Sequence, residues 1–473
     1  MRRFVWAVTI GTALALAASA CGASGDKSAD DDGGTSTTAA AQEASVGAFG
    51  DLQDVCGNGD ARIADGEPGS GTDTLPIGVA TDRSSSIRPG LNKEMWDASV
   101  AFVDWCNDQG GIGGLQLEAV ELDAGLFDVE KAMTQGCHTV FAMVGGGWAQ
   151  DNLQFSGKDN SDFHRCGLID IPGYAVSPQK SDSSGQVQPV PNPGTSVSNT
   201  FLQDYAELYP EESESIAIAY ADLPALEIQK EKYKAAAASQ DLDVVAEIPY
   251  PATGMADWTP LAQSIIQSGA GTLMWVGEAG NVTSAIAKLK EQGWKGHALL
   301  ETNMYDPLLF SQGDEAVEGS VVRQTVYPVE EAARWPATQQ YLDNLERYVP
   351  DAKIAPLGIQ STSAWLLFSV AANACAKAND GVISRTCVLE QAAAQDNWTG
   401  GGLHASQDPA AFSEAHSSAC SMLLIVKGGE FERLYPEIGG EDDDQGGFHC
   451  PDDGVTEVPA NAGKGVVAPG AKI

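Results

Sequence analysis

Apolar and polar positions along this chain follow two periodicities, which predict strands and helices in alternation. Short apolar runs bounded by turn residues predict buried strands, and apolar residues at helical spacing predict helices between them. In the first run, strands are predicted at 75–80, 115–122, 139–144 and 167–171, and helices at 92–108 and 128–138. The first helix is expected to stop at Gly110 and Gly111, because glycine commonly ends helices.

The pattern then starts again after a proline-rich stretch at 187–193. Further strands are predicted at 215–220, 244–248, 272–276, 298–301 and 321–327, with a hairpin at 421–435. Further helices are predicted at 225–239, 260–268, 281–292, 337–349 and 359–378. Alternating strands and helices are typical of an α/β protein whose mostly parallel sheets are flanked by helices. Two successive runs predict two lobes, and ligands of such sheets bind near the carboxyl ends of the strands.

The amino-terminal residues have the pattern of an export signal. Arg2 and Arg3 precede an apolar run at 4–20, which is short for a membrane span. We therefore expect residues 1–20 to be a signal peptide. Cys21 follows small residues, which resembles the lipobox of bacterial lipoproteins, where this cysteine is lipidated. The alternative is an ordinary secreted protein in which Cys21 is free or disulfide-bonded.

Both ends of the mature chain have compositions that are unfavourable for folding. Residues 22–50 are rich in Gly, Ser, Thr, Ala and Asp and contain few large apolar side chains. We expect 21–72 to hold the lipidated cysteine and a flexible tether. We expect 441–473 to be an acidic loop and a carboxyl-terminal tail.

The charge balance excludes some partners. The 473 residues include 65 acidic and 27 basic side chains, which gives a net charge of −38. Such a surface repels nucleic acid and anionic lipid heads, so we expect no nucleic-acid partner. The acidic residues are interpreted chiefly as a solvated exterior.

Nine cysteines in an exported chain indicate disulfide bonds. A zinc site is the competing interpretation, but the chain has no CxxC and its six histidines are scattered, so neither a metal nor a cofactor is expected. One pair of cysteines flanks a short turn between two predicted helices, and a second pair flanks the last predicted strand pair. A third disulfide is preferred among the four cysteines in the first half of the chain. The expected disulfides are Cys375–Cys387, Cys420–Cys450 and Cys106–Cys137, which leaves Cys56 and Cys166 unassigned.

Six blocks of sequence resemble, in order, the leucine/isoleucine/valine-binding family. The longest block is Ala-Phe-Val-Asp-Trp-Cys-Asn-Asp-Gln-Gly-Gly-Ile-Gly-Gly-Leu-Gln-Leu-Glu at 101–118, which contains Gly-Gly-Ile-x-Gly and leads to Asp123. The ordered set of blocks is more specific than this block alone. The other blocks lie at 76–80, 144–147, 171–174, 216–218 and 284–293. The resemblance covers about 73–436. Members of this family are substrate-binding proteins of ABC importers with the type I periplasmic-binding fold.

The resemblance implies two lobes joined by a three-strand hinge. Lobe one would comprise 73–192 plus 329–418, and lobe two 193–328 plus 419–440. It also implies a monomeric, lipid-anchored extracytoplasmic protein that captures a small polar ligand, an amino acid or related amide, for an ABC permease. A sensory or regulatory binding module not coupled to transport remains an alternative. An enzyme is not expected, because Gly-x-Ser-x-Gly is absent.

In this family the ligand sits on loops that follow the strands of lobe one. Here these loops are 82–86, 145–151 and 173–177. Glycines would let backbone N–H groups reach a ligand carboxylate, and a hydroxyl would assist them. Trp148 could stack on a ligand or pack at the lobe interface. The candidate residues are Ser85, Gly146, Gly147, Trp148, Tyr174 and Ser177.

In lobe two, acidic side chains are candidates for holding a ligand ammonium through charge-assisted hydrogen bonds. Glu278 and Glu301 follow predicted strands, and the alternative for each is a solvent-exposed charge. The loop at 221–225 lacks the aromatic residue that the family commonly places there.

Overall fold

The computed structural model describes residues 46–152, 162–410 and 415–459, together with 465, 467–468 and 470–472. The expected signal peptide at 1–20 and the expected lipidation site at Cys21 lie outside the described residues. Within the described ranges, no helix combines the length and apolar character needed to span a bilayer.

Lobe one is the part of the chain built on a four-stranded parallel sheet with the order β3-β2-β4-β5. Its strands are β2 (Thr74–Thr81), β3 (Gln116–Asp123), β4 (Ala142–Val144) and β5 (Asp170–Ile171). Its helices are α1 (Lys93–Asp108), α2 (Val129–Thr139), α3 (Asp162–Arg165), α4 (Pro178–Ser181), α11 (Pro336–Tyr348), α12 (Pro356–Ala378) and α13 (Arg385–Ala393).

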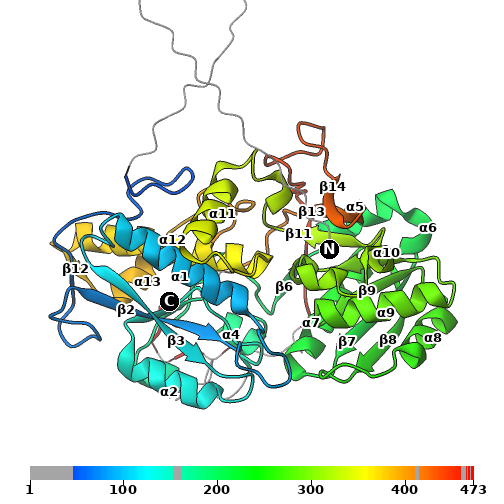
Figure 1. Cartoon of the computed structure of the whole chain (residues 1–473), viewed down its shortest axis with the longest axis horizontal. Coiled ribbons are helices and arrows are strands. Elements are labelled where there is room, and N and C mark those ends of the chain that lie inside the picture. Colours follow the sequence, from blue (N-terminus) through cyan, green and yellow to red (C-terminus); the bar gives the residue numbers. More distant parts are fainter. Residues whose placement is uncertain are drawn as a thin grey trace, which may run out of the picture. The chain divides into compact units, whose positions relative to one another are not determined.

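The two faces of this sheet are covered by different helices. Leu75, Ile77 and Val79 alternate along β2 and pack in one core with α1 and α12. Helices α1 and α12 are far apart in sequence but lie side by side (Figure 1). The opposite face packs against α2 through residues that include Leu122 and Met133.

Lobe two is built on a seven-stranded sheet with the order β14-β13-β11-β10-β9-β7-β8. Its strands are β7 (Ser215–Ala221), β8 (Asp243–Tyr250), β9 (Thr272–Val276), β10 (His297–Leu300), β11 (Val321–Gln324), β13 (Met422–Lys427) and β14 (Glu430–Tyr435). Strands β7 to β11 are parallel, whereas β13 and β14 form an antiparallel hairpin beside β11.

Helices cover this second sheet on both faces too, which confirms the predicted α/β class with sheets flanked by helices. One core holds α8 and α9, and the other holds α5 and α7. The α-helices of lobe two are α5 (Thr200–Leu208), α6 (Pro210–Ser213), α7 (Pro224–Ser239), α8 (Thr259–Ser268), α9 (Ala279–Glu291) and α10 (Asp314–Val317). The 3-10 helices are η1 (Thr302–Met304), η2 (Pro307–Phe310) and η3 (Val329–Glu331).

The chain passes between the two sheets three times: between α4 and β7, between β11 and α11, and between α13 and β13. The carboxyl-terminal segment adds a fourth connection. Its strand β15 (Val455–Glu457) pairs with β6 (Ser196–Ser198), and further on the Ala468 N–H donates to Ser184 Oγ in lobe one at 3.0 Å. The described part of 441–473 is therefore packed structure rather than a free tail, because Phe448 is fully buried and Cys450 is cross-linked.

The described part of the expected tether is also folded. Phe49 and Val55 are fully buried in the core of lobe one. Strand β1 (Arg62–Ile63) pairs in parallel with β12 (Val382–Ile383). A few well-placed apolar side chains hold residues 46–72 against lobe one, although the segment as a whole is poor in them.

Four disulfides are present in the described chain. Cys375–Cys387 and Cys420–Cys450 are confirmed. The expected Cys106–Cys137 pair is wrong, since Cys106 bonds to Cys56 and Cys137 bonds to Cys166. The error has a physical cause: residues 46–72 fold back onto α1, which brings Cys56 within bonding distance of Cys106.

Candidate ligand-binding site

A cavity of about 390 Å³ is lined by residues of both lobes. Its size falls in the range of roughly 300–1,000 Å³ that is usual for small-molecule pockets. Most of its wall follows the carboxyl ends of parallel strands, where ligands of open α/β sheets bind. The strand-end segments that line it come from β2 and β3 in lobe one and from β7, β9 and β10 in lobe two, among others.

The lobe-one wall of this cavity is strongly apolar. Its aliphatic and aromatic lining includes Ile87, Leu91, Leu126, Phe127 and Val176. Phe127 is 59% exposed and Ile87 is 37% exposed, which is unusual for such large apolar side chains. Leu126 has a φ of +82°, in the left-handed region that a leucine rarely adopts. Strained residues of this kind concentrate at functional sites.

Two buried aspartates lie behind this apolar wall and take up its backbone donors. Asp82 accepts hydrogen bonds from the Leu126 N–H and the Ala149 N–H, both at 2.7 Å. Asp151 accepts from the Val176 N–H at 2.6 Å and from the Ser177 N–H at 3.0 Å. Leu126, Ala149 and Val176 all line the cavity, so their N–H groups are committed to internal carboxylates.

Burial dominates the protonation of both aspartates. It raises the pKa of Asp82 above its ordinary value, although the hydrogen bonds from Ala149 and Leu126 act in the opposite direction. Burial also raises the pKa of Asp151 to about 6, against the lowering effect of its hydrogen bonds and of the nearby Lys180 charge. Both groups thus serve as acceptors within the wall, shielded from solvent.

The glycine loop that was expected to cradle a ligand carboxylate packs within lobe one. The Gly147 N–H donates to the Ala80 carbonyl at 2.9 Å. A Cβ at Gly146 would lie 2.2 Å from the Ala80 nitrogen, so glycine is needed there for close packing. Trp148 is only 2% exposed, and its Nε1–H donates to the Leu122 carbonyl at 3.0 Å. None of these three candidates is among the residues that line the cavity.

The two serine candidates also have structural partners. Ser85 is buried, and its Oγ accepts the Arg88 N–H at 3.2 Å. Ser177 is the N-cap of α4, and its Oγ accepts the Lys180 N–H at 3.3 Å. Neither serine is among the lining residues.

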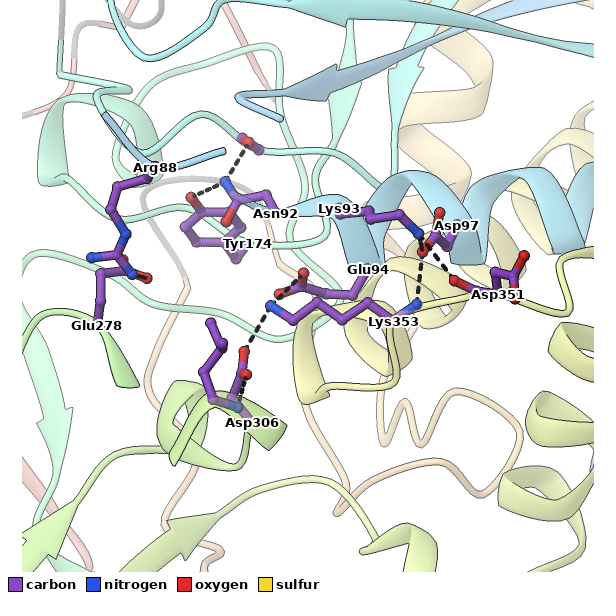
Figure 2. Close-up of polar contacts among 12 residues, drawn as sticks. Arg88, Asn92, Lys93, Glu94, Asp97, Tyr174, Glu278, Asp306, Asp351 and Lys353 are labelled. Carbon is purple, nitrogen blue, oxygen red and sulfur yellow. Dashed lines mark hydrogen bonds and ion pairs between the residues drawn. The ribbon is translucent and has the colours of Figure 1, made fainter. Parts of the chain in front are cut away.

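Tyr174 does line the cavity, as expected. The Asn92 side-chain amide donates to its hydroxyl oxygen at 3.0 Å (Figure 2). Burial raises the pKa of Tyr174 well above its ordinary value, so the phenol stays neutral. Asn92, just before α1, lines the cavity as well, although nothing in the sequence marked it.

Glu278 and Glu301 line the cavity, but each already has a cationic partner. Glu278 pairs with Arg88 at 2.9 Å, and Glu301 pairs with Arg323 at 3.1 Å. Among the described residues, these four are the charged side chains that line the cavity, and their formal charges cancel. The two arginines were not predicted, because Arg323 lies inside a strand and Arg88 lies beyond the loop considered at the end of β2.

Three buried polar side-chain groups of lobe two that line the cavity have no hydrogen-bond partner among the described residues. They are Trp275 Nε1–H, Arg323 Nε–H and the Ser198 hydroxyl. Trp275 stacks on Tyr250 with ring centroids 4.5 Å apart, which fixes the position of its indole. Unpaired buried donors cost free energy, so a ligand acceptor that met them would be favoured.

Two ion pairs join the lobes beside the cavity. Arg88 of lobe one reaches Glu278 of lobe two, as Figure 2 shows. Lys353 of lobe one contacts Asp306 of lobe two at 2.7 Å and also Glu94 of its own lobe at 3.0 Å. These contacts hold the two lobes against each other beside the cavity.

Comparisons with known proteins agree with the two-lobed α/β fold. Residues 74–425 match a family described as periplasmic binding protein. A fatty acid ABC transporter substrate-binding protein from Thermomonospora curvata has a similar solved structure, with a TM-score of 0.64 and 16% identity, covering 80% of this chain and 97% of that one. No curated protein matches the chain by sequence.

Two similar structures come from amino-acid transport systems. One is a branched chain amino acid ABC transporter from Thermus thermophilus with bound valine, with a TM-score of 0.61 and 15% identity, covering 80% of this chain and 96% of that one. The other is the branched-chain amino acid transporter substrate binding protein from Streptococcus pneumoniae in complex with isoleucine, with a TM-score of 0.61 and 14% identity, covering 77% and 100%.

Proposed function

This chain belongs to the periplasmic binding protein family, and we propose that it is the extracytoplasmic solute-binding protein of an ABC importer. It captures a small organic solute in the cleft between its lobes and presents the closed complex to a permease in the membrane. No covalent step is involved. The observation that carries the proposal is the cavity of about 390 Å³ whose wall is shared by two lobes that ion pairs join beside it.

Lobe closure supplies the coupling between binding and delivery. A ligand that contacts both walls has more contacts in the closed state than in the open state, so it shifts the population toward closure. A permease that recognises the closed surface then distinguishes loaded from empty protein. The similar structures from amino-acid and fatty-acid transporters support this use of the fold.

We also propose that Cys21 carries a lipid anchor that keeps the monomer at the outer face of the cell membrane. The support is the order of basic residues, apolar run and small residues before Cys21. Mass spectrometry of the membrane fraction should find a lipid-modified cysteine at the mature amino terminus. A Cys21→Ala variant should be released from the membrane, and its retention there would contradict the anchor.

The binding function is tested with the mature protein and a broad panel of solutes that includes amino acids, amides, sugars, and apolar acids and amines. Any true ligand should raise the melting temperature, since binding to the folded state stabilises it. The same ligand should reduce the radius of gyration in small-angle X-ray scattering. If no solute in the panel raises the melting temperature and none changes the scattering, the proposed function is wrong.

A further inference from the structure

We propose that the cleft selects an uncharged, largely apolar solute, and that Asp82 and Asp151 set this preference by occupying the backbone donors of the lobe-one wall. The inference rests on the proposed function and narrows its ligand. The sequence predicts an amino acid or a related amide as the ligand. This inference keeps the amide and excludes free amino acids, which are zwitterions.

The first step concerns the backbone donors. A ligand carboxylate is held in a cleft of this kind by N–H groups that converge on it. In this chain, the N–H groups of Leu126, Ala149 and Val176 already donate to Asp82 or Asp151 at 2.6–2.7 Å. Asp82 and Asp151 are not among the lining residues, so these three N–H groups are directed away from the cavity. Lobe one therefore offers these three donors to no ligand.

The second step concerns charge. Burying an ion is costly unless it gains an opposite charge and hydrogen bonds. The cationic and anionic side chains of the described cavity wall are already paired, Arg88 with Glu278 and Arg323 with Glu301. A zwitterionic ligand would have to break these pairs to find partners. The net charge of −38 further disfavours anions approaching the cleft.

The third step concerns what the wall does offer. Its apolar lining extends beyond lobe one into the crossover and lobe two, and its uncharged polar lining consists of side-chain amides and hydroxyls. The apolar group adds Val190, Pro191, Val197, Leu223 and Leu226 to those described above. The amide group contains Asn92, Asn192, Gln229, Asn281, Asn303, Gln360 and Gln407. A mostly apolar body with one or two neutral acceptors matches this wall.

The acceptors of such a ligand have a place in lobe two. Trp275 Nε1–H and Arg323 Nε–H lack partners among the described residues, and a carbonyl or ether oxygen could accept from either donor. The exposed rings and chains of Phe127 and Ile87 would be covered by the apolar body. Covering this apolar surface removes it from water, which favours binding in proportion to the area covered.

The test uses matched carbon skeletons, each supplied as carboxylic acid, primary amide and amine, for example decanoate, decanamide and decylamine, together with leucine. Melting temperature and calorimetric affinity are measured at pH 7.5 for the mature protein. We expect the amides to bind at least tenfold more tightly than the matched acids and amines, and leucine to give no shift. Tighter binding of leucine or of the acids would overturn the ligand class while leaving the binding function intact. If neither these compounds nor the broad panel binds, both proposals fail.

A pair of variants tests the apolar wall. Phe127→Ser should weaken amide binding at least fivefold, because it removes an exposed aromatic surface from the cavity. Leu208→Ser is the matched control, since Leu208 is also exposed but does not line the cavity. Equal affinities for the two variants would count against the assigned contact surface.

An aspartate variant tests the positioning role directly. Asp151→Ala removes the acceptor that holds the Val176 and Ser177 N–H groups away from the cavity. A ligand carboxylate that recruits these groups should then bind relatively more tightly, so the ratio of acid affinity to amide affinity should rise at least tenfold. A purely structural role for Asp151 would lower both affinities together and leave the ratio unchanged, which would overturn the role assigned to it. If this variant does not fold, the matched panel on the wild-type protein still decides the ligand class.

Discussion

The two walls of the cavity differ in how far their polar groups are satisfied within the protein. In lobe one, the backbone donors at the strand ends are satisfied by Asp82 and Asp151, which leaves an apolar surface facing the ligand. In lobe two, the charges of the cavity wall are paired, but three buried polar groups of that wall, on Trp275, Arg323 and Ser198, have no partner in the described chain. The backbone donors of the lobe-one wall that belong to Leu126, Ala149 and Val176 are thus satisfied without a ligand, whereas the lobe-two wall gains from one. Affinity for apolar bulk and selectivity for a polar group are expected to reside on opposite walls.

The largest expected effect comes from removing a carboxylate that accepts hydrogen bonds from the backbone of the lobe-one wall. Asp151→Ala leaves two buried backbone N–H groups without their acceptor, and we expect a loss of about 3 kcal/mol in the free energy of unfolding. Urea denaturation followed by circular dichroism measures it. Asp243→Ala is the control, because Asp243 is exposed at the start of β8, and it should change stability by less than about 0.5 kcal/mol. Similar losses for both variants would contradict the supporting role of Asp151.

Lowering the pH should increase the stability that Asp151 gives to the folded protein. The pKa of Asp151 is raised by burial from 3.8 to about 6, so the folded state binds its proton more readily than the unfolded state. The stabilisation that comes from protonating Asp151 is fully present below pH 3.8 and is lost as the pH rises through 6. As the pH falls from 7.5 to 4.5, protonation of Asp151 should add about 2 kcal/mol to the free energy of unfolding.

The measurement is the difference between wild type and Asp151→Asn over that pH range, because other titrating groups contribute equally to both proteins. The advantage of wild type should grow as the pH falls. An advantage that stays constant or shrinks would show that the carboxyl is not perturbed in this direction.

A smaller effect is expected from removing a donor of lobe two. Trp275→Phe keeps an aromatic ring against Tyr250 but deletes the unpartnered N–H, so ligand affinity should fall by about tenfold, or about 1.4 kcal/mol. Trp258→Phe is the matched control, since Trp258 is buried nearby without lining the cavity. An unchanged affinity in Trp275→Phe would mean that the ligand places no acceptor there.

The smallest effect concerns the contact between the walls. Arg88 and Glu278 are both partly exposed, so their pairing should contribute only about 0.5 kcal/mol to closure. A double-mutant cycle with Arg88→Gln and Glu278→Gln, read out as ligand affinity, measures this coupling. It should shrink further at high salt, since exposed charges are screened. A coupling of zero at low salt would show that the pair does not hold the closed state.

Much of this fold was predictable from the pattern of residues, because burial imposes a periodicity. The apolar run at 75–80 corresponds to β2, and the predicted helix at 225–239 corresponds to α7. The short strands β6 and β15 were not predicted, since three residues are too few to establish a period. Their pairing joins distant segments, which no local pattern reveals.

The site was predictable only in part. Strand ends locate the loops of the cavity, and Tyr174, Glu278 and Glu301 do line it. The direction of each side chain is decided by long-range contacts, so Trp148 turned out to be buried on the Leu122 carbonyl. The sequence also did not show that Glu278 and Glu301 form ion pairs, because each arginine partner comes from a different segment of the chain.

The carboxyl-terminal segment gives the hinge an additional property. It adds β15 to β6 in lobe two and then reaches Ser184 in lobe one, while Cys420–Cys450 fastens its beginning to the third crossover. An opening motion must therefore distort this strap along with the three crossovers. We therefore expect the β15–β6 pairing and the Ala468–Ser184 hydrogen bond to oppose separation of the lobes and so to slow the release of a captured solute.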